Sequence, residues 1–333
     1  MLYNFQKTKL CKHLLVGGAL FAVGFGMNSC TDTYDLDTEQ PGGLNSIYGY
    51  MVERGNFQNY MRIVKDLGQE EILSKTGSKT LFLANDAAFE EFYKTCTWEN
   101  ENGEPVRSYE DLTLEQKRVL LGAAMIDNPY TTSMLSTAQG PVRGEVCRRP
   151  TSQTLYDTVE VIKADELDEK LPKNPNWNAL REQKKDVVLF KDNSMAPPTV
   201  HFTPKFLASN KLTREDLNFI YRDRPSSSSD DVYVGNAKIT KANIFCLNGF
   251  IHEVDRVMVP LDNMAEILRK YVSEDPTKSA KIFSDMVERF AAPYYTKATT
   301  DAYNSAKGTE MDSVFVKRYF SKNSQGKTLF DTD

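Results

Sequence analysis

The fold of this chain is decided by the stretch Asn248-Gly249-Phe250-Ile251-His252-Glu253-Val254-Asp255-Arg256-Val257-Met258-Val259-Pro260. Apolar and polar residues alternate imperfectly through it, which is typical of a half-buried strand, and the run closes at a proline. The pair Asn248-Gly249, like Gly235-Asn236 upstream, is a two-residue hairpin signal because such turns need positive φ. We therefore predict an antiparallel meander over residues 231–260.

A second informative stretch lies far upstream. Residues 80–84 are a short apolar run that predicts a strand, and Asn85 or Asp86 can then cap a helix carrying an apolar face. The tetrapeptide Lys-Thr-Leu-Phe at 79–82 recurs at 327–330, which is the pattern of a repeated unit.

Helical spacing of apolar residues surrounds the first of these strands. Residues 44–68 predict two short helices, the second with Asn56 as its N-cap and Gly68 at its end. A further helix is predicted near 113–126.

Together these stretches resemble the two signatures of the fasciclin domain. Residues 80–89 are similar to the first signature and residues 248–260 to the second. The resemblance covers 44–261 and implies an α+β fold, a compact β-sandwich or wedge with helices packed along one side. It assigns a structural role to nine signature residues: Thr80, Phe82, Asp86, Phe89, Asn248, Gly249, His252, Asp255 and Pro260. The identification requires the strands around Phe82 and Ile251 to meet in one sheet.

The chain departs from the family pattern at a functional position. Ala123 and Ala124 stand where many relatives carry a Tyr-His pair associated with cell-surface receptor adhesion. That particular activity is therefore not carried over. Ala84 and Asn85 also differ from the usual Pro and Thr, although both remain compatible with a turn and a cap.

The sequence of the first residues indicates a targeting signal rather than a folded element. Residues 1–29 have a basic start and a short apolar run, and they end just before Cys30, which resembles the lipobox of bacterial lipoproteins. Cys30 is the expected lipidation site, with an ordinary secretory signal as the alternative. Removing 1–29 would take the net charge from −5 to −8, since three lysines and no acids are lost. Residues 30–43 then read as an acidic tether.

The three cysteines after Cys30 form no recognisable framework. One disulfide among Cys96, Cys147 and Cys246 is compatible with the sequence, and the spacing of these residues does not indicate a zinc site. Cys246 lies in an apolar run and is expected to be a small buried side chain.

The chain also contains more than the resemblance needs. A segment of about 163–230 is expected to be a structured insertion between strands, and its Trp177 is a candidate binding residue for a sugar or a protein. The alternative is that Trp177 pins the insertion to its own domain. Residues 262–333 form a mostly helical tail that resembles the start of a second fasciclin-like domain.

Signs of catalytic chemistry are few. The net charge of −5 and the absence of a basic, aromatic-rich stretch argue against a nucleic-acid partner. His252 belongs to a signature, where the resemblance implies packing and hydrogen bonding, and His201 is expected at an exposed or edge position. No phosphate loop, nucleophile arrangement or calcium loop is present, so neither a catalytic residue nor a metal or cofactor is predicted.

The sequence thus predicts a non-catalytic binding or adhesion module of the fasciclin type. It would be lipid-anchored in the cell envelope, at the outer membrane and open to the surface, with an envelope or extracellular protein as its partner. The alternative is an accessory glycan-binding lipoprotein of an outer-membrane nutrient-uptake system. Asp255 is expected to satisfy nearby backbone donors or to pair with Arg256 or a neighbouring helix.

Overall fold

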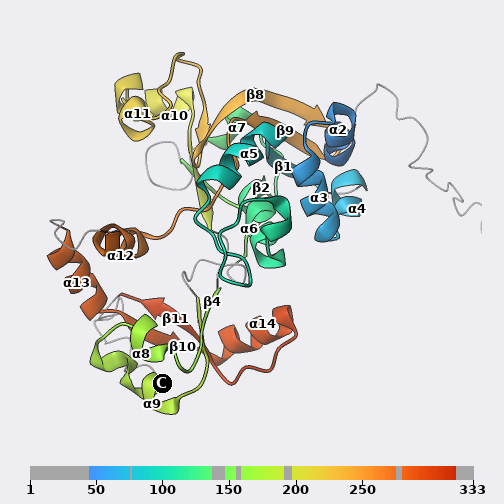
Figure 1. Cartoon of the computed structure of the whole chain (residues 1–333). Helices are drawn as coiled ribbons and strands as arrows, with labels where there is room; N and C mark the ends of the chain where they lie inside the picture. Colours follow the sequence, from blue (N-terminus) through green and yellow to red (C-terminus); the bar gives the residue numbers. More distant parts are fainter. Residues whose placement is uncertain are drawn as a thin grey trace, which may run out of the picture. The chain divides into compact units, whose positions relative to one another are not determined.

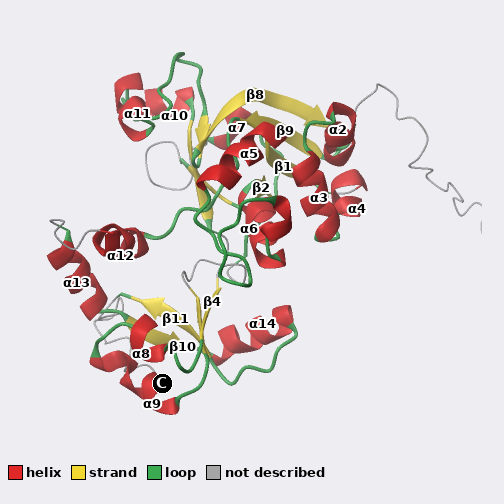
Figure 2. Ribbon diagram, in the orientation of Figure 1, coloured by secondary structure: helices red, strands yellow, loops and turns green. Residues whose placement is uncertain are grey.

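The computed structural model describes residues 45–75, 77–136, 147–154, 159–190, 197–274 and 280–319. The predicted signal peptide 1–29, the lipidation site Cys30, the tether 30–43 and the repeated tetrapeptide at 327–330 all lie outside these residues. In the part of the chain that is described, helices and mixed sheets confirm the α+β class (Figure 1, Figure 2). None of its helices is long and apolar enough to cross a membrane.

The first sheet has seven strands in the order β2-β1-β9-β8-β7-β6-β3. In chain order they are β1 (Lys79–Ala84), β2 (Met125–Ile126), β3 (Arg148–Pro150), β6 (Pro198–Phe202), β7 (Tyr233–Val234), β8 (Ala237–Cys246) and β9 (Gly249–Val254). Strands β1 and β9 run parallel, with Leu81 opposite Ile251 and Phe82 opposite His252. The two signature stretches therefore meet in one sheet, as the sequence predicted.

The meander β7-β8-β9 is antiparallel, also as predicted. Its first turn is Gly235-Asn236, since Val234 pairs with Ala237. The second turn is shifted by one residue from the expected Asn248-Gly249, because Cys246 pairs with Gly249 and leaves Leu247 and Asn248 in the turn.

The two edges of this sheet come together. After β3, the Ser152 N–H donates to the Met125 carbonyl of β2 at 2.7 Å. The backbone of Gln153 then lies against Gly122, where an added Cβ would sit 2.9 Å from the Gln153 Cα. A side chain at 122 would therefore push α6 (Leu114–Ala123) away from the segment that follows β3.

Helices accompany the first sheet along the chain. They are α2 (Ile47–Arg54), α3 (Gln58–Asp66), α4 (Glu70–Lys75), α5 (Asp86–Thr95), η1 (Tyr109–Asp111), α6 (Leu114–Ala123), α7 (Thr132–Leu135), α10 (Pro204–Ser209) and α11 (Arg214–Ile220). The apolar faces of α2, α3 and α5 join β1 and β9 in one continuous core. This burial supplies most of the driving force for folding.

The second sheet has four strands in the order β10-β11-β5-β4. They are β4 (Val159–Ile162), β5 (Val187–Phe190), β10 (Ala292–Tyr295) and β11 (Val314–Arg318), and their helices are α8 (Leu167–Lys170), η3 (Pro175–Trp177), α9 (Asn178–Gln183) and α14 (Lys297–Lys307). Alternate residues of β5 enter two different cores: Val187 and Leu189 pack with Trp177, whereas Val188 and Phe190 pack with Tyr303. Both faces of this sheet are therefore covered.

This second sheet corrects the expected organisation. The segment 163–230 is not one insertion, because β6 returns to the first sheet between β3 and β7. The tail is not separate either, because β11 pairs in parallel with β5. A four-residue apolar strand such as β5 needs neighbours on both edges, and the tail supplies one of them.

Two further helices precede β10. They are α12 (Met264–Glu274) and α13 (Lys281–Arg289), and they contact each other.

Candidate binding sites

The signature residues are used to hold the first sheet and its helices together. Asn248 in the β8–β9 turn accepts from the Ile47 N–H and donates to the Leu73 carbonyl, both at 2.8 Å. One buried side chain therefore fixes α2 and α4 to the sheet. Thr80 similarly donates to the Asn128 carbonyl at 2.6 Å and accepts from the Tyr130 N–H at 2.7 Å.

Asp86 has a role that the sequence did not reveal. Its carboxylate accepts from the Gln58 and Asn59 N–H groups, each at 2.9 Å, and so caps the N-terminus of α3. The predicted cap, Asn56, makes no such bond; the N-cap position is Phe57, which has no side-chain capping bond. The cap therefore comes from α5, which also fixes the packing of the two helices.

His252 is completely buried in β9, and both of its ring nitrogens form hydrogen bonds to the backbone. Its Nδ1 accepts from the Asn243 N–H at 3.1 Å, so its Nε2 carries the proton and donates to the Tyr130 carbonyl at 2.9 Å. The ring stacks on Phe82 with centroids 5.5 Å apart. Asn243 sits at a register shift in β8 with φ of 60°, which frees its N–H for the histidine.

Burial also makes His252 a source of pH-dependent stability. Desolvation lowers the pKa of His252 from its ordinary value of 6.5. The unfolded chain therefore binds a proton first as the pH falls, so this contribution is complete above 6.5 and is lost below it. We expect His252→Phe to flatten the loss of unfolding free energy between about pH 7.5 and about pH 5, because the variant has no imidazole to protonate there. Urea unfolding of the variant and of wild type at both pH values measures this difference. The same pH dependence of the unfolding free energy in both proteins would contradict the prediction.

Asp255 satisfies backbone and side-chain partners, but not the expected Arg256. It accepts from the Lys238 N–H at 2.7 Å and pairs with Arg224 through both oxygens, at 2.7 and 2.6 Å. Arg256 instead pairs with Asp223 at 2.7 Å. The remaining signature residues also fit a structural role: Phe89 is buried edge-to-face on Tyr60, and Pro260 follows the sheet.

His201 differs from expectation because it is completely buried. It lies in β6, which is flanked by β3 and β7 rather than forming an edge. The cysteines Cys96, Cys147 and Cys246 are unbridged. Cys246 is buried as predicted, and its burial raises the pKa of the thiol to about 11.

Trp177, the predicted binding residue, is 0% exposed. Its Nε1 donates to the Ala291 carbonyl at 3.0 Å, and Asn174 Nδ2 donates to the same oxygen at 2.9 Å. The ring packs within the core of the second sheet. It therefore cannot stack on a sugar, and it pins the 159–190 segment to the end of α13.

Among the described residues, the largest group of exposed apolar side chains along the chain lies on and beside α12 and α13. Eight large apolar side chains along and just before these helices are between 44% and 75% exposed: Leu261, Met264, Ile267, Tyr271, Ile282, Phe283, Met286 and Phe290. We call this set the α12–α13 face. Such clustering is uncommon on a surface that meets only water.

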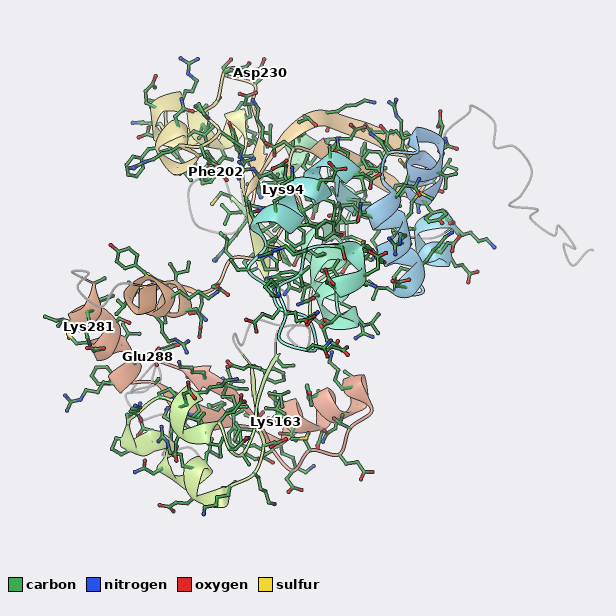
Figure 3. All side chains as sticks on the ribbon, viewed as in Figure 1. Lys94, Lys163, Phe202, Asp230, Lys281 and Glu288 are labelled. Atoms are coloured by element: carbon green, nitrogen blue, oxygen red, sulfur yellow. The ribbon has the colours of Figure 1, made fainter. Side chains whose placement is uncertain are left out.

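The polar side of the same helices is the side in contact with the protein. Glu288 of α13, labelled in Figure 3, pairs with Lys317 of β11 at 3.0 Å. Arg269 of α12 pairs with Glu266 and lies 3.7 Å from Glu288. The Lys317 side chain is almost fully buried, and this burial lowers its pKa. The helix pair α12–α13 is thus held to β11 by ion pairs, while the residues of the α12–α13 face remain exposed.

The α12–α13 face repeats the pattern of α2 and α3. Without gaps within each helix, the apolar positions correspond in pairs: Ile47 with Ile267, Met51 with Tyr271, Tyr60 with Phe283, Ile63 with Met286, and Leu67 with Phe290. Ile47, Met51, Tyr60 and Ile63 are completely buried, in the core shared with β1 and β9. Their counterparts are exposed.

Comparison with known families gives a match to part of the chain. The model of the fasciclin domain matches residues 171–260, which include the second signature. No curated protein matches the chain. Residues 171–260 are therefore similar to a fasciclin domain, and such domains are in general adhesion and binding modules without catalytic activity.

Within the described residues, no three His, Cys, Asp or Glu side chains are grouped to hold a metal ion. The carboxylates and histidines of the signatures are engaged in the contacts given above.

Proposed function

We propose that this protein is a non-catalytic binding module, anchored to the cell envelope by lipid at Cys30, that takes a protein partner on its α12–α13 face. The observation that carries the proposal is the exposure of a pattern that is buried in the α2–α3 pair of the same chain. Large aromatic and aliphatic side chains gathered in this way are what the centres of protein interfaces are made of.

The chemistry of the partner follows from the way in which α2 and α3 are covered in the first sheet's core. There, the corresponding helix faces are covered by the apolar faces of β1 and β9. The partner is therefore a protein that presents an apolar β-sheet face, and α12–α13 act as the opening helices of a second fasciclin-like unit completed by that sheet. The glycan-binding alternative relied on an exposed Trp177, and Trp177 is buried.

A photo-crosslinking amino acid placed at Ile282 in intact cells tests the face. We expect a crosslink to a protein partner there and none at the equally exposed Lys297 on α14. Met286→Asp should weaken binding of the purified partner by about tenfold or more, because a charge replaces a central apolar contact. The matched control is Val52→Asp, an isolated exposed apolar residue on α2, which should leave affinity unchanged.

The anchor is tested separately. Cys30→Ser should abolish incorporation of labelled palmitate and move the protein out of the membrane fraction, while the purified variant still binds the partner. Continued labelling of Cys30→Ser would overturn the proposed lipid anchor but would not bear on the α12–α13 face. Two outcomes would overturn the proposed role of the α12–α13 face. One is a crosslinked partner whose affinity is unchanged by Met286→Asp. The other is crosslinking only to lipid or to a second copy of this chain.

A further inference from the structure

A cavity of about 530 Å³ lies beside the first sheet, at the end of β6 and the β7–β8 turn. Its volume falls in the range of small-molecule sites in proteins. Most of its wall is apolar, contributed by Pro197, Val200, Phe202, Tyr221, Met258 and Pro260. Phe202, labelled in Figure 3, extends from the end of β6. This wall suits a ligand with an apolar body.

Three buried polar atoms of residues that line the cavity have no hydrogen-bond partner. One is the Arg224 Nε, and the other two belong to amide side chains. Gln153 is only 2% exposed, and its Nε2 donor is unpaired. Asn236 uses its Nδ2 to donate to the Val257 carbonyl at 3.0 Å, but its Oδ1 acceptor is unpaired. A buried polar group left without a partner destabilises a fold, so each such group calls for an explanation, and a bound ligand is one.

The charged groups at the cavity are already paired with one another. Arg224 is held by Asp255, and its Nε lies 3.6 Å from Asp223. Arg256 is held by Asp223 at 2.7 Å. A charged ligand would have to break these pairs, whereas an uncharged ligand would leave them intact.

We propose that this cavity binds a small uncharged molecule with an apolar body and an amide or hydroxyl function, which accepts from Gln153 and donates to Asn236. The site shares Leu261 with the α12–α13 face but none of that face's residues within α12 or α13, and it does not involve the lipid anchor. Polar specificity would come from the two unpaired amide groups, and most of the affinity from the apolar wall.

Titration of the full chain with benzamide and with toluene tests this site, followed by the ¹³C-labelled methyl resonance of Met258. Benzamide has an apolar ring and an amide that both donates and accepts, while toluene has only the ring. We expect both probes to shift the Met258 methyl. Gln153→Met should weaken benzamide about tenfold and leave toluene unchanged, because one hydrogen bond is lost from a site of similar shape.

Two variants complete the experiment. Gln183→Met, an exposed change on α9, should alter neither affinity. Ala123→Leu, which adds bulk at the cavity wall, should abolish both, with thermal unfolding as the check that it folds. The proposal is overturned by equal benzamide affinity in Gln153→Met, by unchanged binding in Ala123→Leu, or by probes that leave Met258 unshifted while only water occupies the cavity.

Discussion

Gly249→Ala is expected to destabilise the first sheet more than any other single methyl addition to its glycines. Gly249 has a φ of 146° and lies opposite Lys79, at the start of the parallel β1–β9 pair. A Cβ there would meet the Lys79 carbonyl oxygen at 1.9 Å, and backbone cannot move aside as a flexible side chain can. Because the two signature strands would be forced apart, we expect a loss of about 4 kcal/mol or more of unfolding free energy.

Urea unfolding of the full chain measures this loss, and Gly103→Ala is the matched control. Gly103 also has a positive φ, of 76°, but an added Cβ would meet nothing within 4 Å. It should therefore cost only about 1–2 kcal/mol, the ordinary penalty of a left-handed conformation. Similar losses for both variants would show that the close approach to Lys79 is not what requires glycine.

Trp177→Ala is expected to have the second largest effect, and on the other sheet. The substitution removes a fully buried ring and leaves a large void in the core that joins 159–190 to the tail. Loss of such a ring destabilises by about 3–5 kcal/mol, and the Nε1 bond to the Ala291 carbonyl is lost as well. Amide hydrogen exchange should increase in β4, β5 and β11 while β1 stays protected.

Trp98→Ala is the control for Trp177→Ala. Trp98 is only partly buried and packs edge-to-face on Phe92 beside the first core, 5.7 Å between ring centroids. It should cost less and leave exchange in β5 and β11 unchanged. If Trp177→Ala leaves exchange in β5 and β11 as in wild type, then Trp177 does not hold the second sheet.

The first sheet could be predicted because its signals are local. Gly235-Asn236 encodes a tight turn by its tolerance of positive φ, and the apolar runs beside it encode strands by their period. Even so, the neighbouring turn was displaced by one residue. Asn248 is needed in the turn to bond α2 and α4, and Gly249 is needed in the strand to approach Lys79.

The candidate binding sites were less accessible to prediction. A tryptophan between prolines and asparagines carries no periodic signal, so its exposure could not be judged before the tail was seen to pack on it. Gln153 stands in no motif, and the turn signal that contains Asn236 says nothing about its side chain. Only the burial of their unpaired atoms marks these two residues as candidates. The apolar faces of the tail helices can be recognised in the sequence. They indicate that a surface will be covered, but they do not indicate which element or partner covers it.

The sequence by itself determined that residues around Phe82 and Ile251 form strands, that turns separate the meander, and that α12 and α13 repeat an amphipathic pattern. These follow from backbone preferences and from the spacing of apolar side chains, which act over a few residues. Only the tertiary structure decided that β11 joins β5, that Asp86 caps α3, and that α12 and α13 are attached by their charged side. Those outcomes depend on which surfaces meet, because an apolar face gains the same free energy from burial against any partner of matching shape.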